Sequence, residues 1–286
     1  MVLDYDPTRS ALYTPEQRDS LFIRGHTYTP LQLAIEGARL AYYRVETSAS
    51  ERQRLAEALD RAGFGPPTIF AHAATGSEAF GAIHSSDASA LLAFRGTQPG
   101  SLEDLFTDAR ADFTGWPESA GRVHAGFAAA ARALLPEVRA WLAANERAAT
   151  QLILTGHSLG AALATLTASS VRASLLVTLG SPRVGDAAFA RTIKCPSVRL
   201  VHCCDLVTDL PPPVGGYVHV GWQTYLTRGG DSLADPPTAI VRRDRFAARA
   251  TYPFTYAWRR GAVLVRDLAD HAPINYARSH FAPVTE

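Results

Sequence analysis

The spacing of apolar residues changes along the first third of the chain from a helical to a strand-like pattern. Two segments carry apolar residues at helical intervals, residues 31–44 and 51–62. Three short apolar runs follow, each bounded by turn residues, at 68–71, 79–83 and 90–94. Runs of this length between turns are typical of β-strands. The pattern therefore predicts an irregular segment over 1–30, then two helices, then three strands in an antiparallel meander.

Further strand-like runs occur in the second half of the chain. They lie at 152–154, 175–179, 198–202 and 217–225. Helical patterns separate the first three runs, among them a short candidate at 186–192. Strands that alternate with helices are typical of a mostly parallel sheet with helices on both faces. We therefore expect an α/β fold in which the N-terminal antiparallel meander precedes the parallel strands.

One long helix and one unassigned segment complete the pattern. Helical spacing covers residues 126–145, and Pro136 is expected to kink or restart this helix because proline has no backbone N–H to donate. Residues 228–260 give no clear assignment. Neither a low-complexity linker nor an internal repeat divides the sequence, so we expect a single domain over residues 1–286.

A serine stands between a predicted strand and a predicted helix, with glycines on both sides. The segment is Gly156-His157-Ser158-Leu159-Gly160, directly behind the apolar run 152–154. It is typical of a nucleophile elbow, in which a sharp turn exposes the serine and the glycines let strand and helix approach closely. The pattern predicts a serine hydrolase with Ser158 as nucleophile. The alternative is an ordinary glycine-rich loop with a solvated serine.

A serine nucleophile needs a base and an acid that orients the base. On hydrolase folds with this elbow, the acid follows the serine in the chain and the histidine follows the acid. Asp205 comes directly after a strand-like run and is our candidate, since a loop at a strand's carboxyl end can face the elbow. Asp209 is the alternative, whereas Asp186 is placed to open a short helix.

Three histidines follow the candidate acid. They are His219, His271 and His280. His219 lies in a strand-like run and His280 lies close to the end of the sequence, so position favours His271 as the base. His202 precedes Asp205 and breaks the expected order.

Hydrogen-bond donors are also needed where negative charge forms on the attacked carbonyl oxygen. The backbone N–H of Leu159, directly after the nucleophile, is one candidate. Thr97, in the loop after the third meander strand, can offer both a backbone N–H and a hydroxyl. We expect these two residues to form the oxyanion hole.

Several short motifs, taken in order over roughly residues 31–280, resemble the class 3 lipase family, the fungal-type triacylglycerol lipases. Besides the elbow they are Ala93-Phe94-Arg95-Gly96-Thr97, Val123-His124-Ala125-Gly126-Phe127, residues 178–185, Asp205-Leu206-Val207, Tyr217-Val218-His219, and Asp270-His271 with Tyr276. The resemblance implies an α/β-hydrolase fold that needs neither a metal nor an organic cofactor. It implies Ser158, Asp205 and His271 as the catalytic triad, and Thr97 and Leu159 as oxyanion donors. We interpret two further motif residues, His124 and His157, as structural.

A mobile lid follows the oxyanion residue in this family, and the corresponding residues are 98–122. Apolar side chains that would cover the pocket are Leu102, Leu105, Phe106 and Phe113. An ordinary surface helix is the alternative for this region.

The resemblance implies a carboxylic ester hydrolase that acts on acylglycerols or similar apolar esters and contacts a lipid–water interface transiently. A phospholipase A1-type activity is the alternative among enzymes. Its one indication is the arginine cluster at 242, 243 and 245, for which a solvated surface is the simpler interpretation. A non-catalytic binding module on a hydrolase scaffold is the alternative outside enzymes.

Composition excludes several other classes. A net charge of +1 does not indicate the basic surface that is typical of nucleic-acid binding. The sequence has no run of about 18 apolar residues that would predict a transmembrane segment. No signal peptide is visible, which favours a cytoplasmic location unless the N-terminus was trimmed. The three cysteines, Cys195, Cys203 and Cys204, suggest neither a disulfide framework nor a zinc site; the adjacent pair is expected to be buried in a strand.

Overall fold

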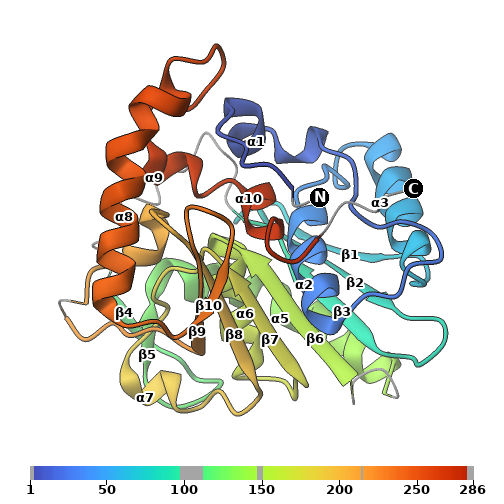
Figure 1. The fold of residues 1–286 in the computed structure, drawn as a ribbon. Helices are drawn as coiled ribbons and strands as arrows, with labels where there is room; N and C mark the ends of the chain where they lie inside the picture. Colours follow the sequence, from blue (N-terminus) through green and yellow to red (C-terminus); the bar gives the residue numbers. More distant parts are fainter. Residues whose placement is uncertain (1–2, 97–111, 147–150, 214, 282–286) are drawn as a thin grey trace.

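The computed structural model describes residues 3–96, 112–146, 151–213 and 215–281. Its strands form one large sheet and one small sheet (Figure 1). The large sheet has the order β1 (Thr68–His72), β2 (Ser77–Ile83), β3 (Ala90–Phe94), β6 (Leu152–His157), β7 (Leu175–Leu179), β8 (Ser197–His202), β9 (Trp222–Leu226) and β10 (Ser232–Ala234). The small sheet pairs β4 (Phe113–Gly115) with β5 (Arg122–His124).

The large sheet joins an antiparallel meander to a parallel array. β1, β2 and β3 pair antiparallel, whereas β3, β6, β7, β8 and β9 pair parallel. β10 pairs antiparallel with β9 at the far edge. The predicted α/β-hydrolase architecture, a mostly parallel sheet with an N-terminal meander, is confirmed. Because the parallel strands share one direction, the carboxyl ends of β6 and β8 lie at the same edge of the sheet, where ligands bind in open α/β sheets.

Helices cover both faces of this sheet. α2 (Pro30–Leu40) packs on β6 from one face, and α6 (Leu159–Ala168) packs on β6 and on α5 (Ala125–Ala144) from the other. Successive side chains of β6 point to opposite faces. Ile153 accordingly belongs to the core under α2, and Leu154 belongs to the core under α5 and α6.

Side-chain caps explain where the N-terminal helices begin. Thr29 and Gln32 form a capping box at the start of α2, and Ser48 caps α3 (Ala49–Arg61). Both predicted helices are confirmed. The prediction that residues 1–30 are irregular throughout is wrong, because Thr8 caps a short helix, α1 (Arg9–Tyr13), which a 3₁₀ turn, η1 (Pro15–Gln17), follows.

The late strand begins later than the sequence predicts. β9 starts at Trp222, and residues 217–221 lie outside it, with only Val218 bridging to Gly185. Gly221 has a φ of +83°, and a Cβ there would lie 3.0 Å from Ser197. The left-handed backbone at Gly221 breaks the extended conformation, so the predicted strand over 217–225 is wrong in its first half.

Two helical segments differ from the predicted pattern. α5 continues across Pro136, so the helix does not restart there, and Leu135 and Val138 are buried on either side of the proline. The predicted kink at Pro136 stays a prediction. The unassigned segment 228–260 contains β10 and a long helix, α8 (Thr238–Tyr252), followed by a π-helical turn, η6 (Pro253–Ala257). In Figure 1, α8 stands at the left side of the molecule, and the chain beyond it forms the topmost loop. Among the described residues, no helix combines the length and apolar character needed to cross a membrane.

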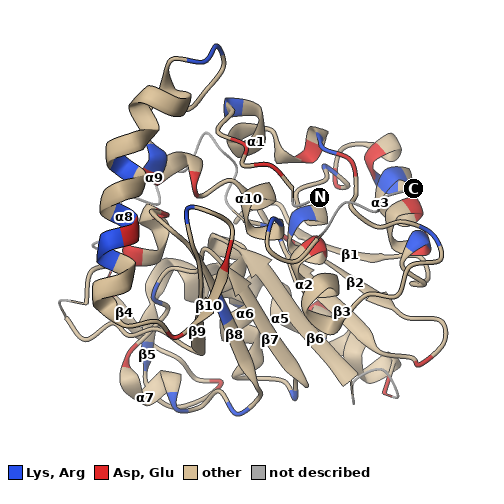
Figure 2. Ribbon diagram, viewed as in Figure 1, with Lys and Arg blue, Asp and Glu red and all other residues tan. Residues whose placement is uncertain are grey.

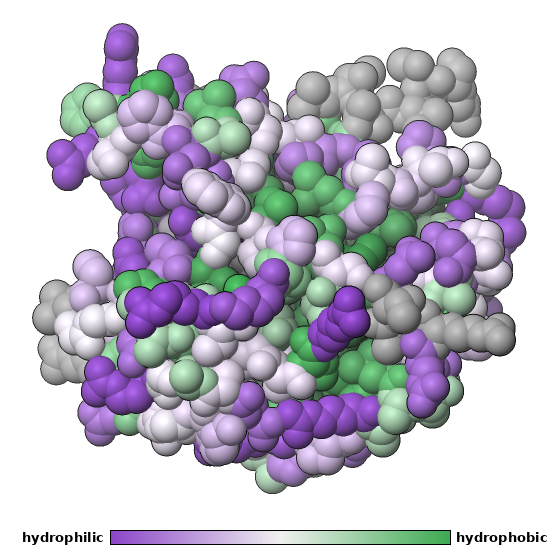
Figure 3. Space-filling model, turned by 90° about the horizontal axis from the view of Figure 1, so that it is seen from below, coloured by the Kyte–Doolittle hydropathy of each residue, from purple (hydrophilic) through white to green (hydrophobic). Residues whose placement is uncertain are grey.

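The edge where the parallel strands begin also carries a cavity. It has a volume of about 950 Å³, and its lining includes Leu33, Ile153 and Leu175. In Figure 3, which views the molecule from below, apolar side chains gather in hollows between polar rims. Ile153 and Leu175 stand at the amino ends of β6 and β7, so this cavity lies at the opposite edge from Ser158, which follows β6.

Candidate active site

Ser158 occupies the sharp turn between β6 and α6. Its φ is +58° and its ψ is −126°, a conformation that residues other than glycine rarely adopt. The backbone N–H of Ser158 donates to the Leu179 carbonyl at 3.0 Å, which ties the turn to the end of β7. The predicted strand–serine–helix arrangement is present, and its strained residue is the candidate nucleophile.

The glycines on either side of this serine are required by close backbone packing. A Cβ on Gly156 would lie 2.3 Å from the carbonyl carbon of Gly160. A Cβ on Gly160 would lie 2.2 Å from the carbonyl oxygen of Phe94 at the end of β3. The two glycines thus let α6 approach both strands, which places the amino end of this helix at Ser158.

The structure brings the two other predicted triad residues together. Asp205 follows β8, and His271 lies between α9 (Arg266–Ala269) and α10 (Pro273–Ala277). His271 Nδ1 lies 2.9 Å from Asp205 Oδ1 and 2.8 Å from Asp205 Oδ2. Both side chains are buried. This pairing fixes the imidazole with Nδ1 toward the carboxylate and leaves Nε2 for chemistry.

Two further donors hold the Asp205 carboxylate. The backbone N–H of Val207 donates to Oδ1 at 2.9 Å, and the Tyr276 hydroxyl donates to Oδ2. Burial, followed by the charge of Asp205, raises the pKa of Tyr276 well above its ordinary value, so the phenol keeps its proton. Sequence analysis placed Tyr276 in a motif without a role; its spacing of five residues from His271 was the available signal.

Three buried side-chain atoms at the site, one each on His157, Ser158 and His271, have no hydrogen-bond partner among the described residues. Buried polar atoms are normally paired, and an exception calls for an explanation such as a catalytic role. Two of the three, Ser158 Oγ and His271 Nε2, are the atoms that a serine hydrolase would use to transfer the serine proton.

His157 contributes a neutral imidazole beside the candidate base. Its ring centroid lies 4.4 Å from that of His271, and its Nδ1 lies 2.7 Å from the Tyr42 hydroxyl. Burial, followed by the charge of His271, lowers the pKa of His157 well below its ordinary value. His157 therefore packs and hydrogen-bonds near the elbow, as predicted, and adds no positive charge there. The other motif histidine, His124, caps α5.

The alternative acids have structural partners elsewhere. Asp209 accepts a hydrogen bond from Arg245 Nη1 at 2.9 Å. Asp186 caps α7 (Ala187–Ala190) by accepting from the Phe189 N–H at 3.0 Å, which confirms that it opens a short helix. Neither carboxylate has a hydrogen bond to a histidine in the described structure.

The imidazoles of the alternative bases have other surroundings. Burial, and then the charges of nearby arginines, lower the pKa of His219 to about 2. His202 Nδ1 lies 2.9 Å from the backbone carbonyl oxygen of Asp270. His280 is half-buried after α10, and burial lowers its pKa. His202 does accept a hydrogen bond from the Asp205 N–H at 2.8 Å, but through its backbone carbonyl. Among the described residues, none of these three imidazoles bonds the Asp205 carboxylate.

The predicted oxyanion hole is described only in part. Leu159 is the first residue of α6, and the N–H groups of a helix's first turn have no acceptor within the helix. Thr97 lies outside the described residues, as does the predicted lid over 98–111. Of the remaining lid residues, Phe113 is in β4, where its ring stacks on Tyr217 at a centroid distance of 4.0 Å. The lid and both oxyanion roles stay predictions.

A buried ionic cluster surrounds Arg95, the residue directly after β3. Arg95 contacts Glu78 and lies 3.1 Å from Glu46 Oε1. Burial, followed by the hydrogen bond with Glu46, raises the pKa of Glu78 to about 7. Sequence analysis missed this cluster, because the three residues are far apart in the chain and each alone is an ordinary surface type.

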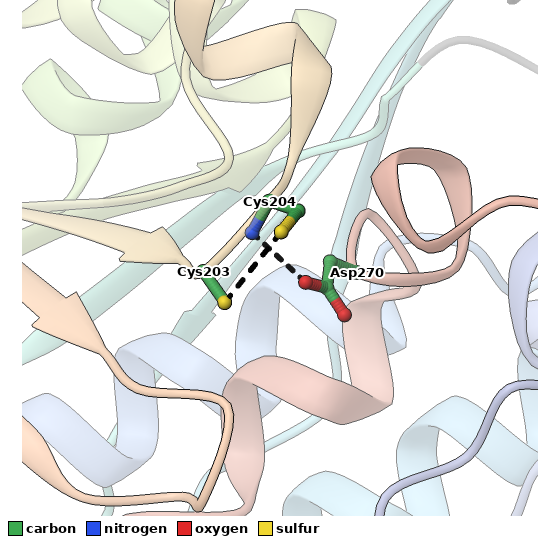
Figure 4. Close-up of side chains that lie close together, drawn as sticks. All are labelled: Cys203, Cys204 and Asp270. Atoms are coloured by element: carbon green, nitrogen blue, oxygen red, sulfur yellow. Dashed lines mark hydrogen bonds between the residues drawn. The ribbon is translucent and has the colours of Figure 1, made fainter. Parts of the chain in front are cut away.

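A second cluster supports the segment before His271 (Figure 4). Asp270 Oδ2 accepts from the Cys204 N–H at 2.9 Å and from Arg266 Nε at 3.0 Å, and Oδ1 accepts from the Tyr5 hydroxyl at 2.8 Å. The sulfur atoms of Cys203 and Cys204 lie 3.7 Å apart. Both cysteines are buried as predicted, but they follow β8 instead of lying inside it.

The donors in this second cluster do not match a metal site. The two sulfurs and an Asp270 oxygen lie within 4.8 Å of one another. However, the hydrogen bond with Cys204, and then burial, raise the pKa of Cys203, so its thiol keeps a proton that a metal ligand would have to lose. Arg266 already neutralises the carboxylate. We interpret the cluster as a brace that holds α9 and His271 against the end of β8.

A parallel sheet with a nucleophile elbow, and a buried Asp–His pair at the same edge, define this protein as an α/β-hydrolase. Residues 91–215 match the family model described as Lipase (class 3). The matched part is less than half of the chain, and it contains Ser158 and Asp205.

Known lipases resemble the chain in sequence and in structure. A lipase from Rhizopus niveus is 30% identical over 181 residues, which cover 57% of this chain and 45% of that lipase. The chain thus spans about half the length of the curated relatives it matches. The crystal structure of a lipase from Rhizopus microsporus var. chinensis is 27% identical, with a TM-score of 0.57 over 69% of this chain and 73% of that one. A triacylglycerol lipase whose catalytic centre is formed by a serine protease triad is 25% identical, with a TM-score of 0.56 over 69% of this chain and 77% of that one.

Proposed function

We propose that this protein hydrolyses carboxylic esters of apolar acids, with acylglycerols as its substrate class, through an acyl-enzyme on Ser158. The observation that carries the proposal is the Asp205–His271 hydrogen bond, which leaves His271 Nε2 unpartnered at the edge of the sheet where the elbow presents Ser158. The lipases to which the chain is similar support the choice of ester and of acylglycerol.

In the acylation step, His271 Nε2 takes the proton of Ser158 Oγ while that oxygen attacks the ester carbonyl carbon. The carbonyl oxygen becomes negatively charged and accepts hydrogen bonds from Leu159 and Thr97. When the intermediate collapses, the bond to the alcohol oxygen breaks, and His271 returns the proton to the leaving alcohol. Ser158 then carries the acyl group as an ester.

Deacylation repeats these proton transfers with water. His271 Nε2 removes a proton from a water molecule, whose oxygen attacks the acyl carbon. The bond to Ser158 Oγ breaks, the serine recovers its proton from His271, and the carboxylic acid leaves. Throughout, Asp205 orients the imidazole and stabilises its protonated form. The donors from Val207 and Tyr276 hold the Asp205 carboxylate in place.

Two features of the fold favour this chemistry. The amino end of α6 points its partial positive charge at the position where the oxyanion forms. The site is also buried, so its hydrogen bonds act in a medium of low polarity, where they are stronger than in water.

The phospholipase A1 alternative has little support from the arginine cluster. Arg245 is half-buried, and it donates to the Cys203 carbonyl at 2.7 Å and to Asp209. The prediction of a solvated cluster is therefore wrong for Arg245, while Arg242 and Arg243 are exposed. A non-catalytic module is disfavoured by the unpartnered buried atoms Ser158 Oγ and His271 Nε2.

Hydrolysis of p-nitrophenyl esters from acetate to palmitate by wild type and Ser158→Ala tests the proposal. We expect turnover in the wild type to be lost in the variant, and a fluorophosphonate to label only the wild type. Ser170→Ala, which removes a hydroxyl just past α6 that bonds the Thr167 carbonyl, is the matched control and should stay active. Equal turnover in wild type and Ser158→Ala would show that the elbow is not the nucleophile.

A further inference from the structure

Residues 238–265 form an exposed projection that is rich in aromatic and aliphatic side chains; we call it the α8 spur. Phe246 is 75% exposed, Phe254 84% and Trp258 73%. Of the ten large apolar side chains that are exposed in the described part of the chain, six belong to this spur: Ile240, Phe246, Phe254, Trp258, Leu264 and Val265. Clustered exposed apolar side chains indicate an interaction surface.

The spur is also strongly basic in a chain that is nearly neutral. It contains six arginines and one aspartate, whereas the whole chain carries a net charge of +1. Arg245 and Arg249 are paired with Asp209 and Asp267. The remaining four, Arg242, Arg243, Arg259 and Arg260, are exposed and have no ion-pair partner within the described residues. Figure 2 shows the arginines along α8 and at the loop beyond it.

The base of the spur is fixed to the elements that carry the candidate triad. Ala248 and Tyr252 are buried, and the Tyr252 hydroxyl donates to the Val263 carbonyl at 2.7 Å. Arg245 Nε donates to the carbonyl of Cys203, two residues before Asp205. At its other end, the spur runs directly into α9 and His271. The surface is therefore held at the edge of the sheet where the proposed reaction takes place.

The two kinds of side chain match two layers of a lipid surface. Tryptophan and phenylalanine favour the boundary between headgroups and acyl chains, and arginines attract anionic headgroups. At the tip, Arg259 lies over the rings of Tyr256 and Trp258, at 4.9 Å and 5.9 Å from their centroids, so cation and aromatic groups share one site. Unpaired basic charge next to exposed aromatic rings is complementary to an anionic bilayer.

We infer that the α8 spur docks this protein on an anionic lipid surface, with Phe254 and Trp258 inserted at the interface and Arg242, Arg243, Arg259 and Arg260 on the headgroups. Docking would bring the edge that holds Ser158 and His271 to the phase in which apolar esters reside. The inference rests on the proposed function, which gives the reason for docking, but binding to the lipid surface does not itself require catalysis.

Sedimentation with lipid vesicles tests the docking in the Ser158→Ala protein, which cannot turn over an ester. We expect binding to vesicles of phosphatidylcholine mixed with phosphatidylglycerol, weaker binding to phosphatidylcholine alone, and release by salt. Arg242→Gln with Arg243→Gln should weaken binding about thirtyfold, at about 1 kcal/mol per arginine. Arg172→Gln with Arg191→Gln, an equally exposed pair outside the spur, should leave it unchanged.

The aromatic contribution needs its own pair of variants. Phe254→Ser with Trp258→Ser should abolish most vesicle binding, whereas Trp222→Ser, which removes a side chain that is 77% exposed on β9, should not. Thermal melting checks that each variant is folded. Equal vesicle binding by all variants would overturn the inference. So would a concentration-dependent dimer that only the spur variants lose, since the surface would then bind a second copy of the chain.

Failure of the docking and failure of the proposed function remain distinguishable. Turnover of soluble p-nitrophenyl acetate by the wild type and by Trp222→Ser reports on the catalytic site without any lipid surface. Turnover without vesicle binding would refute the docking alone. Vesicle binding without any turnover would leave the docking standing and refute the esterase.

Discussion

Tyr276 donates its hydroxyl hydrogen to the same carboxylate, Asp205, that accepts the hydrogen bond of His271. The three side chains are buried, and a Cβ on Gly180 would lie only 2.7 Å from Asp205 Oδ2, so the carboxylate has little room to turn. The phenol therefore acts as a positioning residue for the candidate acid, in a place where water cannot substitute for it.

Tyr276→Phe should reduce kcat for p-nitrophenyl butyrate about tenfold. The loss of one hydrogen bond to a charged group costs about 1.5–3 kcal/mol, and part of this cost lowers the stability of the fold instead of the rate. Steady-state kinetics of wild type and variant at one pH measures the loss. Tyr225→Phe is the matched control, since its hydroxyl donates to a different carboxylate, Asp244, at 2.9 Å. It should lower the melting temperature while kcat for the same ester stays within a few-fold of wild type.

Asp205→Asn should lower kcat by about 10⁴, because an amide would hold the imidazole in the wrong tautomer. Asp209→Asn, four residues away, should stay within a few-fold of wild type because that carboxylate pairs only with Arg245 and is 45% exposed. Steady-state kinetics on one soluble ester compares the two variants. Similar losses in both would argue against the assignment of Asp205.

Gly160→Ala should destabilise the fold by more than about 3 kcal/mol, because its Cβ would collide with backbone atoms that cannot move aside. Gly115→Ala in β4 meets nothing within 4 Å and should change the free energy of unfolding by less than about 0.5 kcal/mol. Denaturant unfolding monitored by circular dichroism measures both. If Gly160→Ala were as stable as Gly115→Ala, the described contact between α6 and β3 would be wrong.

Glu78 should make stability depend on pH. Its pKa is raised on folding from 4.5 to about 7, so its contribution to stability is complete below 4.5 and is lost as the pH rises through about 7. Hydrogen bonding with Glu78 and the charge of Arg95 lower the pKa of Glu46 despite its burial, so Glu46 stays ionised over this range. The free energy of unfolding of the wild type, relative to Glu78→Gln, should therefore fall between about pH 5 and about pH 8. A difference that stays constant with pH would exclude this titration.

The predicted lid over 98–122 has a kinetic consequence. If this region covers the pocket until the protein meets lipid, hydrolysis of tributyrin should increase sharply where the substrate exceeds its solubility. A smooth saturation curve through that concentration would favour the ordinary surface helix. Because the α8 spur also predicts a response to lipid, the measurement should be repeated with Phe254→Ser and Trp258→Ser, which leave the lid region intact.

Local patterns in the sequence were enough for the elements around the nucleophile. The spacing of Gly156, Ser158 and Gly160 behind an apolar run reflects a backbone crossing that tolerates no Cβ, so the elbow could be predicted from its residues alone. Chain order then favoured Asp205 as the acid and His271 as the base but left Asp209, His219 and His280 as alternatives; the resemblance to class 3 lipases implied the pair.

Other features depend on contacts that the sequence pattern does not contain. α8 escaped prediction because only Ala248 and Tyr252 are buried along its length, so it shows no continuous apolar stripe. The ionic cluster of Glu46, Glu78 and Arg95 depends on how three distant segments pack. The role of Tyr276 could not be derived either, since a buried tyrosine beside a histidine is also compatible with simple core packing.

The backbone at Ser158 has a consequence for how this position could change. A φ of +58° suits glycine, so folding alone would favour glycine between β6 and α6. A side chain at this point reduces stability without improving the core, and its presence is explained only by its chemistry. A related chain that no longer needed the reaction could replace this serine by glycine. Such a chain would lose activity and gain stability, because glycine adopts a positive φ without strain.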